Sequence, residues 1–382
     1  MRAQIAVLAI WAGFIALVQR WPSWEEGIRV QFANDMGVYE VIARAAPSLP
    51  DTDILRAYAQ RFAPHWLVGV LSDATDVSLH SLYRIVAIVC VGFILVAVHV
   101  ALAGLGLDLR AYALALGAVA GSAYPVQYLL AAPGMVSDGI FVLGLAIVLL
   151  GFARVSPWVL VAGLGLATVG RQTALPLAVA AAAWAAFYPA WRPVRKQVVA
   201  GCLLVPAALY LFIYLVSNSF SQPRPAGIDD LTVIGFFTSF HELGRHVGLV
   251  ALGIAVPAAL VVGSWLRVRG PVPWGPLLLA ATVAGQPLVL GPLANRSNEP
   301  RLAGLATPAL AVTAAILLRS ASLTRVETLV CAAAIAVGGL HHRYTNSVFD
   351  SNVAWAIAVL ISALVIVSVL ALGRPRSKTA PA

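Results

Sequence analysis

An asparagine–aspartate pair, Asn34-Asp35, lies in the longest polar stretch of the chain, residues 20–80. A carboxylate that faces water can act as a general base toward a hydroxyl group when its surroundings tune its pKa. The same pair also suits the start of a helix continuing to Ala46, because Asn and Asp accept hydrogen bonds from the first free backbone amides. Both interpretations stay open. Glu40, five residues after Asp35, is either a second carboxylate of such a site or part of a solvated helix face.

Two further candidates border apolar runs. Asp138 follows Pro133 at the start of one run, where it is either a helix cap or a carboxylate that needs a partner near the bilayer. Arg171-Gln172 interrupts the apolar stretch 157–188. An arginine there needs an anion, a carbonyl or water, and a phosphate fits its guanidinium fork. The alternative is an arginine whose side chain reaches the membrane surface.

A polar segment late in the chain carries Arg296, Glu299 and Arg301. Two arginines and a carboxylate so close together could clamp a phosphate, or they could form a solvated turn in which Glu299 pairs with an arginine. His341, followed by His342, opens another polar loop. Adjacent residues on a helix point apart, so this pair is a poor metal motif. The sequence therefore predicts no metal site here, although a divalent cation stays possible elsewhere.

The elements that must position these residues are membrane helices. Of 382 residues, 60% are hydrophobic and 11% are charged, against about 25% charged in soluble domains. Repeated apolar runs near the ~20 residues that cross a bilayer predict an all-α polytopic membrane protein. We expect one transmembrane domain, 1–373, containing a first outer loop, 20–80, and a cytoplasmic tail, 374–382. The net charge of +9 lies in short loops, which is the positive-inside pattern rather than a nucleic-acid surface.

About 12 transmembrane helices are predicted, at residues 3–18, 82–104, 111–131, 137–153, 157–170, 173–188, 198–217, 246–266, 273–293, 301–318, 326–340 and 353–372. As one helix, the stretch 157–188 would be about 48 Å long, too long for a single crossing. Two short helices meeting at Arg171 are expected instead. Twelve spans place both termini in the cytoplasm and most short-loop cations inside, whereas eleven spans would turn the Arg110 and Arg154 loops outward.

The first loop is expected to hold two short amphipathic helices lying on the outer surface. The first has an apolar stripe at helical spacing, made of Val38, Val41, Ile42 and Ala45. The second has a stripe made of Ile54, Tyr58 and Phe62. The segment Asp51–Asp53 supplies candidates to cap the second helix.

Taken together, these features resemble the GT-C superfamily of glycosyltransferases, multi-span enzymes that use polyprenyl-phosphate-linked sugars. The likeness rests on an early acidic residue in a long outer loop, here Asp35, and on the stretch Pro133–Asp138 that opens a later span. It also rests on a short helical hairpin that turns at an arginine, in Gly170–Thr173. A weaker match is Glu299–Arg301 ahead of an apolar helix containing Pro308.

The resemblance implies a mechanism. Asp35 would be the base that deprotonates an acceptor hydroxyl, and the sugar would leave the lipid phosphate in a single displacement with inversion. Arg171, with Arg296 or Arg301, would stabilise the departing phosphate. Where many relatives carry two acidic residues this chain has Asn34, and an amide oxygen is a poorer ligand for a divalent cation than a carboxylate.

The partners implied are the lipid bilayer of the inner cell membrane, a polyprenyl-phosphate-linked sugar and a glycan, lipid or protein acceptor. Two other classes stay open: a secondary transporter or lipid-linked-sugar flippase, and a non-catalytic membrane subunit. Transporters place ionisable groups near the bilayer midplane in repeated halves. Convergence of Asp35, Asp138, Arg171 and Arg301 on one outer cavity would favour the enzyme.

Overall fold

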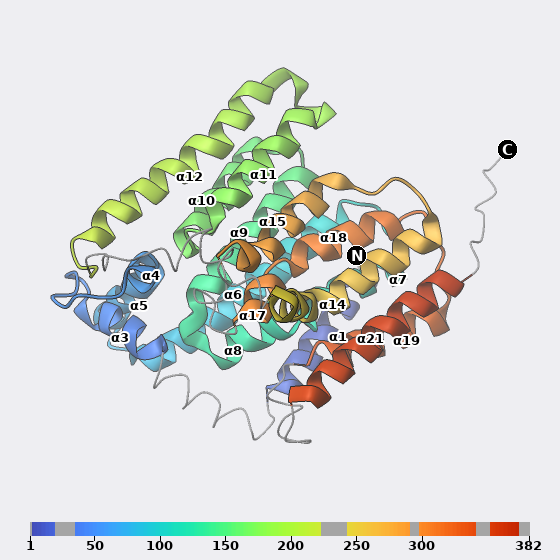
Figure 1. Ribbon diagram of the computed structural model, residues 1–382, viewed down its shortest axis with the longest axis horizontal. Coiled ribbons are helices and arrows are strands. Elements are labelled where there is room, and N and C mark those ends of the chain that lie inside the picture. Colours follow the sequence, from blue (N-terminus) through green and yellow to red (C-terminus); the bar gives the residue numbers. More distant parts are fainter. Residues whose placement is uncertain (1, 20–34, 223–242, 291–297, 341–351, 374–382) are drawn as a thin grey trace.

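The computed structural model describes residues 2–19, 35–222, 243–290, 298–340 and 352–373 (Figure 1). Within these ranges every element is a helix, apart from one isolated bridge between Ile54 and Ser221. The elements are α1 (Arg2–Val18), α3 (Asp35–Ala45), α4 (Arg56–Ala59), α5 (Phe62–Thr75), α6 (Leu79–Ala103), α7 (Leu109–Ala120), the π-helix η1 (Ala123–Tyr128), α8 (Leu129–Ala131), η2 (Pro133–Met135), α9 (Val136–Ala153), α10 (Pro157–Gly170), α11 (Ala174–Phe187), η3 (Pro189–Val194), α12 (Arg195–Asn218), α14 (Leu243–Val268), α15 (Trp274–Leu290), α17 (Glu299–Gly304), α18 (Thr307–Leu318), α19 (Arg325–Gly338) and α21 (Asn352–Leu372).

The chain is a membrane protein of all-α class. In the described ranges, five helices are long and apolar enough to cross a bilayer: Leu79–Ala103, Pro133–Ala153, Pro189–Asn218, Gly244–Val268 and Val353–Leu372. A sixth is added if the stretches 109–120 and 123–131, bent by 48° at their junction, are one span. Other predicted spans hold shorter apolar helices, such as α1, α10, α11 and α18. The membrane class is confirmed, and the count of twelve spans stays a prediction.

The hairpin predicted around Arg171 is confirmed. Helix α10 ends at Gly170 and α11 begins at Ala174. Each has 14 residues, or about 21 Å, which is short of a bilayer core about 30 Å thick. Gly170 packs against α9 so closely that a Cβ atom there would lie 2.7 Å from the carbonyl oxygen of Ser137. This glycine therefore brings Arg171 beside the first turn of α9.

From residue 35 on, the described part of the first loop folds into three helices, α3, α4 and α5, which lie along the left edge of the molecule in Figure 1. On α3, Ile42 is buried as predicted, but Val41 is 43% exposed. The buried face instead carries Met36, Tyr39 and Ala43. Val41 lies off this packed face because α3 packs on α5 and η2 through a different side, and its predicted place on the outer membrane surface stays a prediction.

The start of the second amphipathic segment also differs from the prediction. Helix α4 begins only at Arg56, and its N-cap residue, Leu55, forms no side-chain cap bond within the described structure. Asp51–Asp53 therefore do not cap it. The reason is that Ile54 is extended and pairs with a distant segment. Its amide donates to Phe220 O at 2.9 Å, and its carbonyl accepts from Gln222 N at 2.8 Å.

Two pairs of polar side chains lie at opposite ends of α14. Near its start, His246 bonds Glu299 of α17, and near its end, Arg267 pairs with Glu327 of α19 at 3.0 Å. The 26 residues of α14 span about 39 Å. Arg110, at the start of α7, donates to Leu323 O, in the same linker as the Arg267 partner Ser322. The described bundle thus has one polar end near Glu299 and another near Glu327.

Candidate functional site

A buried charge cluster is the main candidate site. Asp138 lies in the first turn of α9, Arg171 in the turn after α10, and Arg301 in the short helix α17. Nη1 of Arg171 donates to Oδ1 of Asp138, and Nε of Arg301 lies 3.5 Å from Oδ2. The three residues are at most 7% exposed. Three residues predicted from separate segments therefore meet in one place.

A fourth member, Arg61, precedes α5. Its Nη1 donates to the Tyr39 hydroxyl at 3.2 Å, and it interacts electrostatically with Asp138. Burial lowers the pKa of Arg61, but Tyr39 and Asp138 outweigh this effect, and the net direction is upward. Sequence reasoning missed Arg61 because a charged residue in an amphipathic loop is ordinary. The available signal was its spacing of four from His65, which places both on one side of an otherwise apolar segment.

The cluster carries an excess of positive charge. Its three guanidinium groups stay protonated, since arginine does not lose its proton in proteins at ordinary pH, and among the described residues they face one carboxylate, that of Asp138. The Nε atoms of Arg61, Arg171 and Arg301 are buried and have no hydrogen-bond partner among the described residues. Guanidinium groups with unused donors are suited to bind a dianion such as a phosphate.

A neutral histidine of α5 links the cluster to helices α3 and α6. His65 is fully buried, with Nδ1 3.0 Å from the Tyr83 hydroxyl and Nε2 2.8 Å from the Ser137 hydroxyl. Its ring stacks on Tyr39 at a centroid distance of 3.8 Å. Burial lowers the pKa of His65 to about 3, and the charge of Arg61 acts in the same direction, against that of Asp138. His65 is a second residue that sequence reasoning missed.

The first turn of α3 lies beside this cluster. Met36 packs on Gly134 of η2, where a Cβ atom would lie within 2.3 Å of the Met36 side chain. Asp35 is the first residue of α3, but its side chain lies outside the described structure, as does all of Asn34. The structure thus places the start of α3 next to η2, just ahead of Asp138, and tests neither the base nor the cap interpretation of the pair.

The remaining predicted residues have other surroundings. Glu40 pairs with Arg44 at 2.5 Å and lies 3.6 Å from His80, at the surface and apart from the cluster. Gln172 is next to Arg171, and its Oε1 is buried without a hydrogen-bond partner in the described ranges. Arg296 and His341 lie outside the described residues.

Glu299 and Arg301 share α17 but have different partners. Glu299 is fully buried and accepts a 2.5 Å bond from Nδ1 of His246, so within the described part its partner is a histidine rather than an arginine. Arg301 turns toward the cluster, where its guanidinium lies 5.8 Å from the centre of the Tyr128 ring and its Nη1 contacts Met135 Sδ at 3.4 Å.

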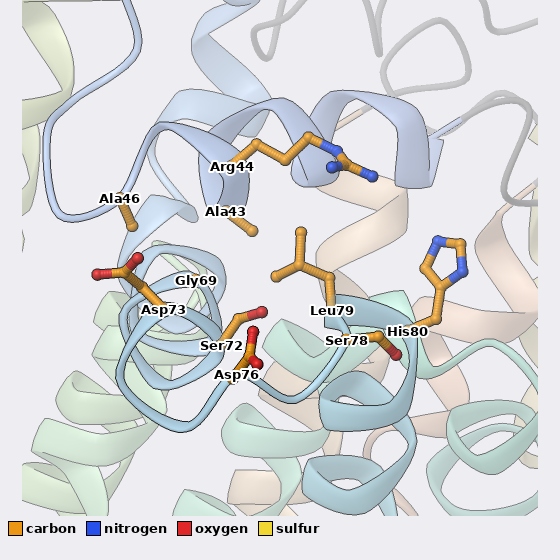
Figure 2. A pocket seen from close by; sticks show the side chains of 10 residues that line it. All are labelled: Ala43, Arg44, Ala46, Gly69, Ser72, Asp73, Asp76, Ser78, Leu79 and His80. Carbon is orange, nitrogen blue, oxygen red and sulfur yellow. The ribbon is translucent and has the colours of Figure 1, made fainter.

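A separate open groove of about 510 Å³ lies between α3 and the turn joining α5 to α6 (Figure 2). Its lining includes Ala43, Arg44, Ala46, Gly69, Ser72, Asp73, Asp76, Ser78, Leu79 and His80. At its floor α3 and α5 nearly touch, since a Cβ atom at Gly69 would lie 1.9 Å from Ala43 O. In Figure 2, Ser72 and Asp76 point toward each other, while Asp73 points outward. The groove and the cluster have no lining residue in common, and both adjoin α3: Ala43 and Arg44 line the groove, and Tyr39 bonds Arg61.

Among the described residues, no three His, Cys, Asp or Glu side chains gather in a way that could hold a metal ion. Comparisons of the chain with protein-family models, with curated proteins and with solved structures found no significant match.

Proposed function

We propose that this chain is a multi-pass glycosyltransferase of the inner cell membrane, similar to the GT-C superfamily, with both termini in the cytoplasm. It moves a sugar from a polyprenyl-phosphate donor to an acceptor hydroxyl at the outer face. The observation that carries the proposal is the convergence of Asp138, Arg171 and Arg301 in one buried cluster.

The charge of the cluster fits the leaving group of this reaction. When the bond between the sugar and the phosphate breaks, negative charge grows on the phosphate oxygen. Preformed cationic donors in a dry site stabilise such charge strongly. Among the described residues, three guanidinium groups against one carboxylate leave two positive charges for the phosphate, and Asp138 holds Arg171 and Arg301 in place.

The depth of the cluster fits a lipid donor. Helices α10 and α11 are each about 21 Å long, so Arg171 at their junction lies below the far membrane surface if the hairpin starts at the other one. A cation at that depth requires a partner, and it is Asp138 here. The phosphate of a lipid-linked sugar lies near the same boundary.

In the proposed mechanism, Asp35 accepts the proton of the acceptor hydroxyl. The acceptor oxygen bonds the anomeric carbon as the bond from that carbon to the phosphate oxygen breaks, which inverts the configuration. The contact between Met36 and Gly134 supports this role, because it puts the start of α3 beside the segment that leads to Asp138.

One observation favours the transporter alternative. The helix formed by α7, η1 and α8 is bent by 48°, and broken helices are common at transporter binding sites. A transfer assay separates the two functions, because a transporter moves a lipid-linked sugar across the membrane without breaking its bond to the phosphate.

The test uses purified protein in nanodiscs with radiolabelled polyprenyl-phosphate sugars and acceptor from cell membranes. Wild type should transfer the label, Asp35→Asn should abolish transfer, and Arg171→Lys should weaken the use of the donor. Asp53→Asn, an exposed carboxylate of the same loop, is the matched control. Full transfer by Asp35→Asn would remove Asp35 as the base, and translocation of intact donor without transfer would support the transporter instead.

A further inference from the structure

We propose that His65 is a positioning residue that fixes the charge cluster relative to the start of α3. The inference rests on the proposed function, because it concerns the geometry of the same site. It starts from the place of His65, whose side chain contacts three other helices: α3 through Tyr39, α6 through Tyr83, and α9 through Ser137.

The hydrogen bonds assign the tautomer of His65. The Tyr83 hydroxyl donates to the carbonyl of Tyr39 at 3.5 Å, so its oxygen accepts from Nδ1–H of His65. Nε2 then carries the lone pair and accepts the Ser137 hydroxyl proton at 2.8 Å. A neutral ring is also what its surroundings favour, since a protonated one would add a further positive charge beside Arg61.

Ser137 is the residue through which His65 acts on the cluster. It precedes Asp138 in the first turn of α9, and the N-cap residue of that helix, Met135, makes no side-chain cap bond in the described structure. Helix ends usually rely on such bonds to hold their first turn. The bond from Ser137 to His65 therefore provides side-chain support for the turn that carries Asp138.

Tyr39 is the residue through which His65 acts on α3. Its ring lies flat on the imidazole, with an angle of 9° between the planes, and its hydroxyl accepts from Arg61. Residue 35 lies four positions before Tyr39 and so shares its side of the helix. The buried ring of His65 thus contacts both the first turn of α9, which carries Asp138 of the charge cluster, and helix α3, which begins with the proposed base, Asp35.

The test compares variants that keep different parts of the network. His65→Gln can keep a hydrogen bond at the position of Nε2, whereas His65→Asn can reach only Tyr83, and Ser137→Ala removes the bond to α9. We expect kcat for sugar transfer to fall about 10- to 100-fold in His65→Asn and Ser137→Ala, because misplacement of reacting groups by about 1 Å costs that much. His65→Gln should recover most of the loss.

The matched control is His99→Gln, because His99 also bonds a tyrosine, Tyr112, at 2.6 Å, but near the other end of α6. Its kcat should equal that of wild type. A merely structural role of His65 would lower the melting temperature of all His65 and Ser137 variants without a selective loss of kcat. That result, or wild-type kcat in Ser137→Ala, would overturn the proposal.

A second measurement does not depend on transfer. Farnesyl phosphate serves as a probe of the cluster, and its affinity should fall about 10-fold in Ser137→Ala and His65→Asn, again from misplaced groups, and recover in His65→Gln. If wild type transfers no sugar but binds the probe with this ranking, the glycosyltransferase proposal fails and the positioning role holds. Equal affinity in all variants, or no binding by wild type, refutes the positioning role.

Discussion

Asp138 is the only carboxylate that the described structure places among Arg61, Arg171 and Arg301. Asp138→Asn leaves three buried guanidinium groups without a counter-charge, whereas Arg171→Gln reduces the excess positive charge. Removing one partner of a buried ion pair typically costs about 3–5 kcal/mol. We therefore expect Asp138→Asn to lower the melting temperature in detergent more than Arg171→Gln does.

Glu40→Gln is the control for this comparison. Glu40 pairs with Arg44 through side chains that are 22% and 66% exposed respectively, and pairs that water reaches in this way contribute about 0–1 kcal/mol. Its melting temperature should stay near that of wild type. An Asp138→Asn protein that melts with wild type would show that the cluster does not depend on this carboxylate.

His65 makes stability depend on pH. Its pKa is about 3 in the folded protein and about 6.5 in an unfolded chain, so between these values the unfolded state binds more protons. Stability is therefore full above pH 6.5 and falls toward pH 3, with a limiting slope of about 1.4 kcal/mol per pH unit. Melting curves from pH 7.5 to 5 should show this fall in wild type and not in His65→Gln, and parallel curves would contradict it.

Sequence reasoning found the residues whose charge is unusual where they occur. Asp138, Arg171 and Arg301 border apolar runs, so each demands a partner. Arg61 and His65 were missed because polar residues are expected in an amphipathic loop. The partner of Glu299 could not be predicted either, since His246 reaches it only after α14 and α17 pack.

The contact between α3 and α5 depends on Gly69. A Cβ atom there would lie 1.9 Å from Ala43 O, and backbone cannot yield easily. Gly69→Ala should therefore push α3 away from α5, disturb the floor of the groove and expose the Tyr39–His65 stack. Overpacking of this kind costs about 1–3 kcal/mol. Hydrogen exchange of α3 amides should increase.

Gly92→Ala is the matched control, because nothing lies within 4 Å of a Cβ atom at that position of α6. Its exchange pattern and melting temperature should stay at or slightly above wild type, since alanine favours the helix by roughly 1 kcal/mol. Unchanged protection of α3 in Gly69→Ala would mean that the two helices accommodate the added methyl group without loss of their contact.

Elements were predictable where the local sequence itself interrupts a helix. The break at Gly170-Arg171 was located because the apolar stretch is too long for one crossing. The predicted span 111–131 instead splits into α7, η1 and α8, and Pro125 inside η1 is the local signal, since proline lacks the amide that continues a helix. The late start of α4 was not predictable, because it depends on Phe220 and Gln222, far along the chain.

For the whole molecule, the sequence predicts the class of protein better than the number of crossings. Apolar composition alone indicates a helical membrane protein, but α10, α11 and α18 are shorter than a crossing helix needs. Their length does not say whether each crosses or enters and returns. What matters for topology is whether the number of crossings between two loops is odd or even.

Labelling of two introduced cysteines decides this parity. The native Cys90, Cys202 and Cys331 are buried, and both Thr52 and Ser320 are exposed. With twelve spans, nine predicted crossings separate these residues, so Thr52→Cys should react from outside intact cells and Ser320→Cys only in inside-out vesicles. A hairpin of α10 and α11 that enters and returns removes two crossings and keeps the sides opposite. If α10 and α11 together made one crossing, both cysteines would react on the same side. Reaction of both cysteines only from the inside would place the Asp138 end in the cytoplasm and contradict the proposed outer site. Reaction of both from the outside would keep that site and contradict the predicted inner position of Ser320.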